Sequence, residues 1–120
     1  MSLSKAEHVA AAQRFEQFLA VVPPQYAEWK IIVLFYSALH YVEAFLVTRS
    51  AAYRDHTIRD QAMEKETETR AIRATYNRLK KAAHEARYEG TPFRPTDVAE
   101  FERLHQMVKR AILVLPGMTV

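Results

Sequence analysis

The sequence contains no cysteine, only two glycines and only five prolines in 120 residues. A chain without cysteine forms neither disulfides nor thiolate metal sites, which fits a reducing compartment. So few glycines and prolines do not supply the many turns of an all-β fold. Charged residues also interrupt the N-terminal stretch before any secretory-type apolar run develops. We therefore expect a helical, cytoplasmic protein.

What is present is an ordinary globular composition, with 49% hydrophobic and 26% charged residues. The length is typical of one domain with a core of its own. The sequence shows no internal repeat and no low-complexity segment. We expect residues 1–120 to form a single helical domain.

Apolar residues recur at helical spacing, which predicts an all-α bundle of four to five helices. Ser4 and Glu7 have capping-box spacing, so the first helix is expected to begin there and to end at Pro23. The polar patch "EKETET" is expected to bend or interrupt the chain after the third helix. The other helices are expected at about 25–49, from about 56, at about 68–88 and at about 97–115.

The stretch "KIIVLFYSALHYVEAFL", residues 30–46, is almost wholly apolar. A membrane span needs about 20 such residues, and this run is at the short limit. His40 and Glu43 fall in its second half, where ionisable groups are costly in lipid. We therefore interpret it as the central helix of the bundle and expect no membrane span.

Tyr36, His40 and Glu43 share one side of that helix, because they follow three-and-four spacing. They form either a polar cluster lining a cleft, in which Glu43 raises the pKa of His40, or buried groups bonded within the core. We favour the second interpretation, because a buried polar group needs a partner whether or not it acts.

Metal binding is not expected. A carboxylate-bridged di-iron bundle needs two Glu-x-x-His motifs, and the sequence has one, Glu102 with His105. No glycine-rich phosphate loop and no "GxSxG" occurs. The prediction is a protein without metal or other cofactor.

Positive charge is concentrated between Arg70 and Tyr88, where six Lys or Arg residues face a single acid, Glu85. This segment has a net charge of +5 in a chain of +3, so the rest sums to −2. A stripe at three-and-four spacing is suited to phosphate contacts, although an ordinary solvated helix face has the same appearance. The predicted nucleic-acid-binding residues are Arg70, Arg73, Asn77, Lys80, His84 and Arg87.

The segment "YRDHTIRD" places Arg54, His56 and Arg59 near an expected helix start. Such a helix end offers free N–H groups to an anion. The alternative is a loop held by surface pairs of these arginines with Asp55 and Asp60, which contribute little stability.

Three stretches together, "WKIIVLFYSALHYVEAFL", "RDHTIR" and "YNRLKKAAHEARYEG", resemble small stand-alone members of the HEPN superfamily. The resemblance covers residues 29–90. It implies an up-down bundle of four or five helices that pairs into a homodimer. Members act as metal-independent ribonucleases, as toxins paired with nucleotidyltransferase-type antitoxins, or as non-catalytic RNA- or nucleotide-binding modules.

For the ribonuclease alternative, the resemblance implies an arginine followed at short spacing by a histidine at a helix start. Two pairs match that spacing, Arg49 with His56 and Arg78 with His84, and His56 lies closer to an expected helix start. The residues named for catalysis are therefore His56, Arg49, Arg54 and Arg59. The histidine would act as general acid or base for attack by a 2′-hydroxyl, with arginine stabilising the developing charge. Our leading hypothesis is a HEPN-like module that binds RNA or nucleotide, with ribonuclease or toxin–antitoxin partner as the alternatives.

Overall fold

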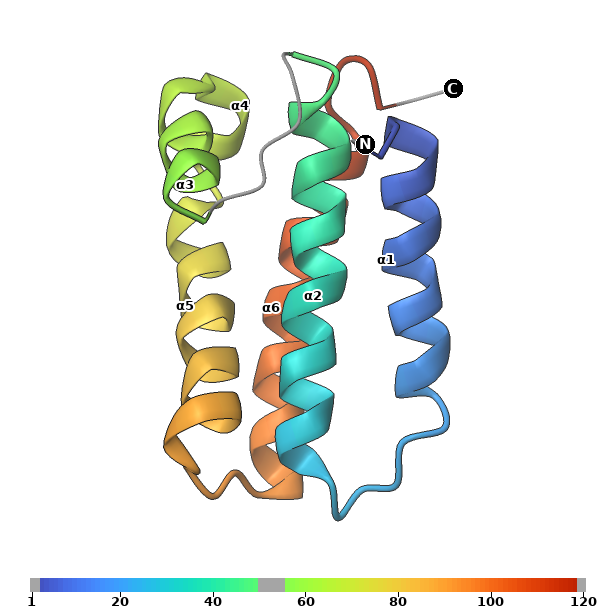
Figure 1. Ribbon diagram of the computed structural model, residues 1–120, viewed down its shortest axis with the longest axis vertical. Helices are drawn as coiled ribbons and strands as arrows, with labels where there is room; N and C mark the ends of the chain where they lie inside the picture. Colours follow the sequence, from blue (N-terminus) through green and yellow to red (C-terminus); the bar gives the residue numbers. More distant parts are fainter. Residues whose placement is uncertain (1–2, 50–55, 119–120) are drawn as a thin grey trace.

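The computed structural model describes residues 3–49 and 56–118, the side chains of residues 56–58 excepted. The described residues form helices and turns without any strand, which confirms the predicted all-α fold. The four long helices alternate in direction (Figure 1), so they form an up-down bundle. The elements are α1 (Lys5–Leu19), α2 (Ala27–Leu46), α3 (His56–Lys65), α4 (Thr67–Arg70), α5 (Arg73–His84), the π-helical η1 (Glu85–Glu89) and α6 (Pro95–Leu113).

Local capping determines several of the helix ends. The Ser4 hydroxyl accepts a hydrogen bond from the Glu7 N–H at 3.1 Å, and the Glu7 carboxylate accepts one from the Ser4 N–H at 2.9 Å. The predicted capping box is therefore confirmed. Gly90 ends η1 with a φ of 66°, a left-handed conformation that glycine adopts without steric cost.

Helix α2 is the centre of the core and lies between α1, α5 and α6 (Figure 1). Fifteen of its 20 residues are buried within this single chain. It is the one described helix long and apolar enough to cross a membrane, yet most of it is buried in the bundle. Since one chain covers α2, its apolar composition is not by itself a reason to expect a dimer.

The expected continuous helix over residues 68–88 is wrong, because the chain leaves helical geometry at residues 71–72. Residue 66 separates α3 from α4, as the "EKETET" patch predicted, and Ile72 leaves helical geometry before α5 begins. The buried Thr69 hydroxyl donates to the Met63 carbonyl at 2.7 Å, and such a side-chain bond offers the backbone an alternative to the helix. The described residues therefore contain six α-helices and one π-helix rather than four or five helices.

Candidate nucleic-acid interface

A groove of about 660 Å³ lies between α2 and the continuous helical segment of α5 and η1. That volume is within the range of small-molecule sites. The polar and aromatic side chains that line it are Phe35, Tyr36, Asp60, Asn77, Lys80, Lys81, His84, Arg87 and Tyr88.

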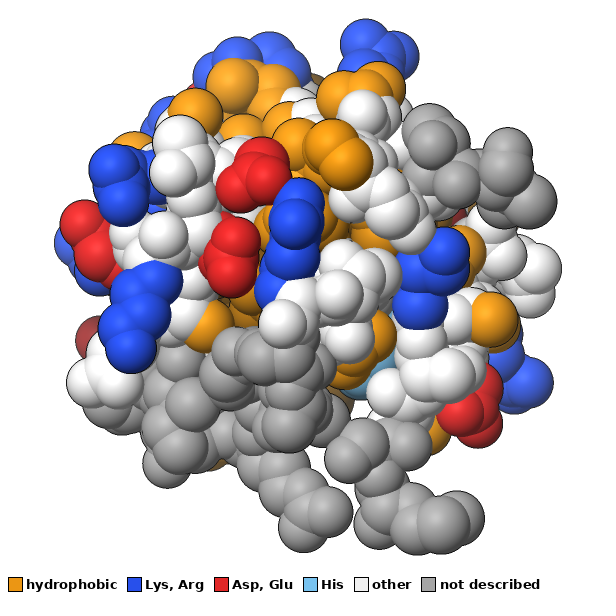
Figure 2. Space-filling model, turned by 90° about the horizontal axis from the view of Figure 1, so that it is seen from above, with side chains coloured by type: hydrophobic (Ala, Val, Ile, Leu, Met, Phe, Trp, Pro, Cys, Tyr) orange, Lys and Arg blue, Asp and Glu red, His pale blue; other side chains and the backbone are white. Residues whose placement is uncertain are grey.

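Four of the six predicted nucleic-acid-binding residues line this groove, namely Asn77, Lys80, His84 and Arg87. The other two do not, because the break before α5 places Arg70 in a different helix. The Arg70 guanidinium donates to the Glu64 carbonyl, and Arg73 pairs with the Glu64 carboxylate at 3.1 Å. The single predicted stripe is therefore divided into a groove and an end of the bundle. Figure 2, which looks onto that end, shows acidic and basic side chains interspersed.

The cations of the groove differ in how they are paired. The Lys80 ammonium lies 2.7 Å from the Asp60 carboxylate. Within the described residues Lys81 makes no ion pair, and its side chain is exposed. Arg87 donates to the Tyr36 hydroxyl at 2.5 Å, a neutral partner. Three cations and one acid give the groove a net charge of +2, before any proton on His84.

Aromatic rings lie beside these cations. The Tyr88 side chain is 64% exposed, and the Arg87 guanidinium lies 4.9 Å from its ring centroid. The His84 ring lies 5.1 Å from Tyr88, measured between centroids. Exposed aromatic faces next to cations are the elements of a site that stacks bases and holds phosphates.

The π-helical segment η1 was not predicted from the sequence. It follows α5 directly and ends at Gly90. Its wider turn changes the direction of Arg87 and Tyr88 relative to a continued α-helix. Single π-helical turns are rare in proteins, and those that do occur are often found at functional sites. No composition rule distinguishes "EARYE" from an ordinary helical turn, so the π-helix could not be predicted from the sequence.

Tyr36, His40 and Glu43 do not bond to one another, because each has a partner on a different element. Tyr36 faces Arg87 in the groove, and His40 Nδ1 lies 3.0 Å from His8 Nδ1 on α1. Burial lowers the pKa of His40 to about 4, with the neighbouring His8 and Arg59 acting in the same direction. The less favoured alternative, in which Glu43 raises this pKa, does not agree with the lowered value.

Glu43 instead forms a buried ion pair with Arg59 of α3. The exposed fraction is 2% for Glu43 and 6% for Arg59. The buried Tyr76 of α5 lies in the same region, and burial raises the pKa of its phenol. Asp55 and Asp60 were the partners considered for Arg59 from the sequence, and this buried pair with Glu43 was not among them. The pair joins residues 16 apart, a distance at which no helical spacing rule applies.

The residues named for catalysis are not brought together in the described part of the chain. Arg49 pairs with Glu68 at 2.7 Å and lies over the Phe45 ring, whereas Arg59 is buried against Glu43. Arg54 and the side chain of His56 lie outside the described residues. Arg59 is therefore unavailable to a substrate at the surface.

His105 of the Glu-x-x-His motif has a structural partner. Its Nε2 lies 2.9 Å from the Ser37 hydroxyl, which itself donates to the Ala12 carbonyl. Since Ser37 has a single proton to give, His105 is the donor in this contact. Ser37 thus bonds to α1 rather than to its own helix. Residues 3–49 and 56–118 contain no group of three His, Asp or Glu side chains placed to hold a metal.

The side chains of the groove that the sequence analysis did not name are Phe35, Lys81 and Tyr88, and His8 was not named as the partner of His40. Lys81 was missed because it lies one position away from the predicted stripe. Tyr88 was missed because the π-helical turn, which was not predicted, contains it. Comparison of the chain with protein-family models, with curated proteins and with solved structures finds no match. The geometry of the groove is therefore the basis for a functional proposal.

Proposed function

We propose that this chain is a HEPN-like helical module that binds RNA or nucleotide in the groove between α2 and α5–η1. The observation that carries the proposal is the gathering of Lys80, Lys81 and Arg87 beside the exposed Tyr88 in one groove. Phosphates supply most of the affinity of such sites, and rings supply stacking. The HEPN assignment itself rests on the resemblance of residues 29–90.

The pairing pattern supports an exchangeable anion site. Tyr36 is a neutral partner for Arg87, so a phosphate oxygen can replace it with a gain of charge attraction. Lys81 makes no ion pair among the described residues, so no ion pair has to break before it contacts a phosphate. Asp60 holds Lys80 in place and also limits the net charge, which favours a ligand of few phosphates over a long duplex.

The test is RNA binding at low salt, followed by fluorescence anisotropy of a labelled single strand. We expect Lys81→Glu to weaken binding strongly. Arg78→Glu is the matched control, because Arg78 lies on the same helix but pairs with Glu100 outside the groove. Three phosphate contacts give a slope of log affinity against log salt of about −2 for a single strand. Absence of binding at low salt, or equal loss in both variants, contradicts the proposal.

The ribonuclease alternative has less support, because Arg59 is committed to Glu43. Its test is incubation with mixed RNA in EDTA. Cleavage that is lost in His56→Ala supports catalysis, and intact RNA rejects it. Homodimer formation, a nucleotidyltransferase-type partner and a cytoplasmic location remain proposals that rest on the sequence. Light scattering that gives a monomer at micromolar concentration would contradict the dimer.

A further inference from the structure

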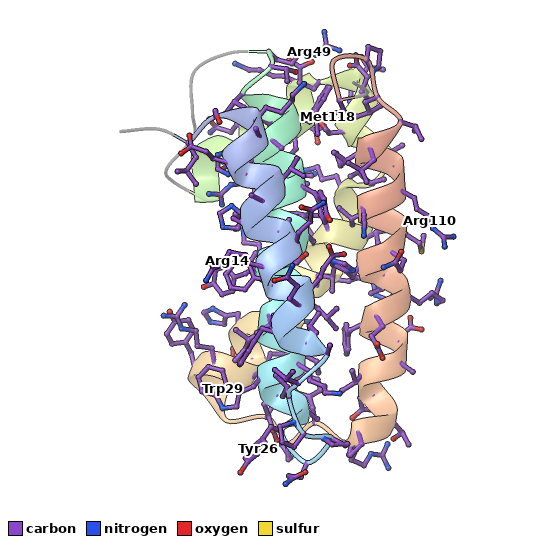
Figure 3. The ribbon with its side chains drawn as sticks, turned by 90° about the vertical axis from the view of Figure 1, so that its right-hand side faces the viewer. Arg14, Tyr26, Trp29, Arg49, Arg110 and Met118 are labelled. Carbon is purple, nitrogen blue, oxygen red and sulfur yellow. The ribbon has the colours of Figure 1, made fainter. Side chains whose placement is uncertain are left out.

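A second, apolar pocket of about 440 Å³ lies where α1 turns into α2. Three of its side chains are aromatic and about half exposed: Phe18 at 49%, Tyr26 at 49% and Trp29 at 58%. Figure 3 shows Tyr26 and Trp29 at the lower end of the bundle, with Trp29 on the side where η1 lies. Large exposed rings gathered at one place on a small protein mark a binding surface.

Two helices connect this pocket with the basic groove. Trp29 and Tyr36 are seven residues apart on α2, so they lie on the same face with a separation of about 10.5 Å along the axis. On α1 the Phe15 ring lies 6.2 Å from the Tyr36 ring, and Phe18 follows one turn later. A path of aromatic side chains therefore leads from the groove to the apolar pocket.

The charge along this path is complementary to a polyanion. Lys81 and Arg87 lie at one end. Arg14 is exposed on α1, four residues before Phe18, and makes no ion pair with any described residue. Figure 3 shows Arg14 on the same side of the bundle as Trp29. The acids nearest to the path in sequence are Glu16, Glu28, Glu85 and Glu89. Glu16 pairs with Lys109 of α6 at 2.7 Å, and Glu89 faces His84 at 3.6 Å.

We propose that the groove and the apolar pocket form one binding surface for single-stranded RNA of three or more nucleotides. Phosphates occupy the groove, and an unpaired base stacks on Trp29. The separation of about 10.5 Å corresponds to about three nucleotides at ~3.4 Å each along a stacked strand. A duplex hides the faces of its bases, so only a single strand presents one to Trp29. This inference rests on the proposed RNA binding and specifies its ligand.

Trp29 is the only tryptophan of the chain, so its fluorescence reports on this pocket alone. The experiment titrates the protein with oligouridylates of one to six nucleotides at low salt. We expect quenching from three nucleotides upward and none with the mononucleotide. Anisotropy of a labelled hexanucleotide should show that Trp29→Ala weakens binding by about 5- to 150-fold, the range of one stacked base.

Two variants separate stacking from damage to the fold. Trp29→Phe keeps an aromatic face and should retain most of the affinity of the wild type for the labelled hexanucleotide. Met107→Ala removes another exposed apolar side chain, on α6, and should change nothing. The circular dichroism of all three variants should match that of the wild type.

The outcomes distinguish this inference from the function on which it rests. If the hexanucleotide binds with a dependence on Lys81 but neither quenches Trp29 nor responds to Trp29→Ala, the extended surface is wrong and the groove stands. If no RNA binds at low salt, both proposals fall. If Trp29→Ala instead turns a dimer into a monomer by light scattering and leaves RNA affinity unchanged, the pocket holds a second copy of the chain and this inference is overturned.

Discussion

Two arginines bond to side chains on the same face of α2, in very different surroundings. Their partners on α2 lie seven residues apart in the sequence. Arg87 of η1 donates to Tyr36 at the surface of the groove. Arg59 of α3 pairs with Glu43 in the interior, where both side chains are almost fully buried. The residue type and the supporting helix are shared, so the two sites differ in burial and in the charge of the partner. The difference teaches which positive charges can meet a ligand and which are committed to the fold.

The physical reason is the cost of removing charge from water. A buried ion pair that loses one partner leaves the other charge uncompensated, which is strongly destabilising. A surface contact is exchanged readily for water or for another anion, and it contributes little to stability. We therefore expect the same substitution to affect stability at one site and binding at the other.

The largest effect is expected for Arg59→Met. The substitution keeps much of the side-chain volume but leaves the Glu43 carboxylate buried without its cation. We expect a loss of about 3–5 kcal/mol in the free energy of unfolding, measured by urea denaturation. RNA binding by the fraction that remains folded should be unchanged.

The control for this prediction is the double variant Glu43→Leu with Arg59→Met. Replacement of both charges by apolar side chains should recover most of the lost stability, because no charge is then left unpaired. A loss below about 1 kcal/mol for Arg59→Met alone would show that the pair is not buried in solution.

A smaller effect is expected from pH, through the histidine pair of α1 and α2. Burial lowers the pKa of both His8 and His40 in the folded state, that of His40 to about 4. Between about pH 6.5 and pH 4 the unfolded chain therefore binds more protons than the folded chain, so stability falls on acidification. Partial exposure of His40 screens the effect, and we expect a loss on the order of 1–2 kcal/mol.

The measurement is the urea midpoint of unfolding at pH 7.5 and at pH 4.5. The variant His40→Gln removes one titrating group and should reduce the dependence on pH relative to the wild type. Carboxylates titrate in both proteins, so the difference between the two slopes isolates the histidine. Parallel slopes would mean that burial does not lower the pKa of His40 in solution.

The smallest effect on stability is expected for Arg87→Met, the counterpart of Arg59→Met. Arg87 is exposed and bonds to a neutral hydroxyl, so the free energy of unfolding should change by less than about 0.5 kcal/mol. RNA binding should weaken, and the salt slope should fall by about 0.7, the share of one phosphate contact. A large loss of stability here, with binding intact, would reverse the comparison.

The sequence predicted the helices better than it predicted the contacts between them. The capping box at Ser4, the helix start at His56 and the central position of α2 follow from local spacing and composition. Four of the six residues of the predicted basic stripe line the groove for the same reason, because they belong to one helix and its extension. The break before α5 was missed, since neither Ala71 nor Ile72 is a helix-stop residue.

By itself the sequence determined that this chain is helical, where α2 lies and where positive charge is dense. Those properties depend on residues three or four positions apart, which meet on a helix whatever else the chain does. Only the tertiary structure decided that Arg59 meets Glu43, that His8 meets His40 and that Arg87 faces the groove. Such contacts join residues on different helices, so they depend on how the helices pack, and burial then decides whether a charge serves the fold or a ligand.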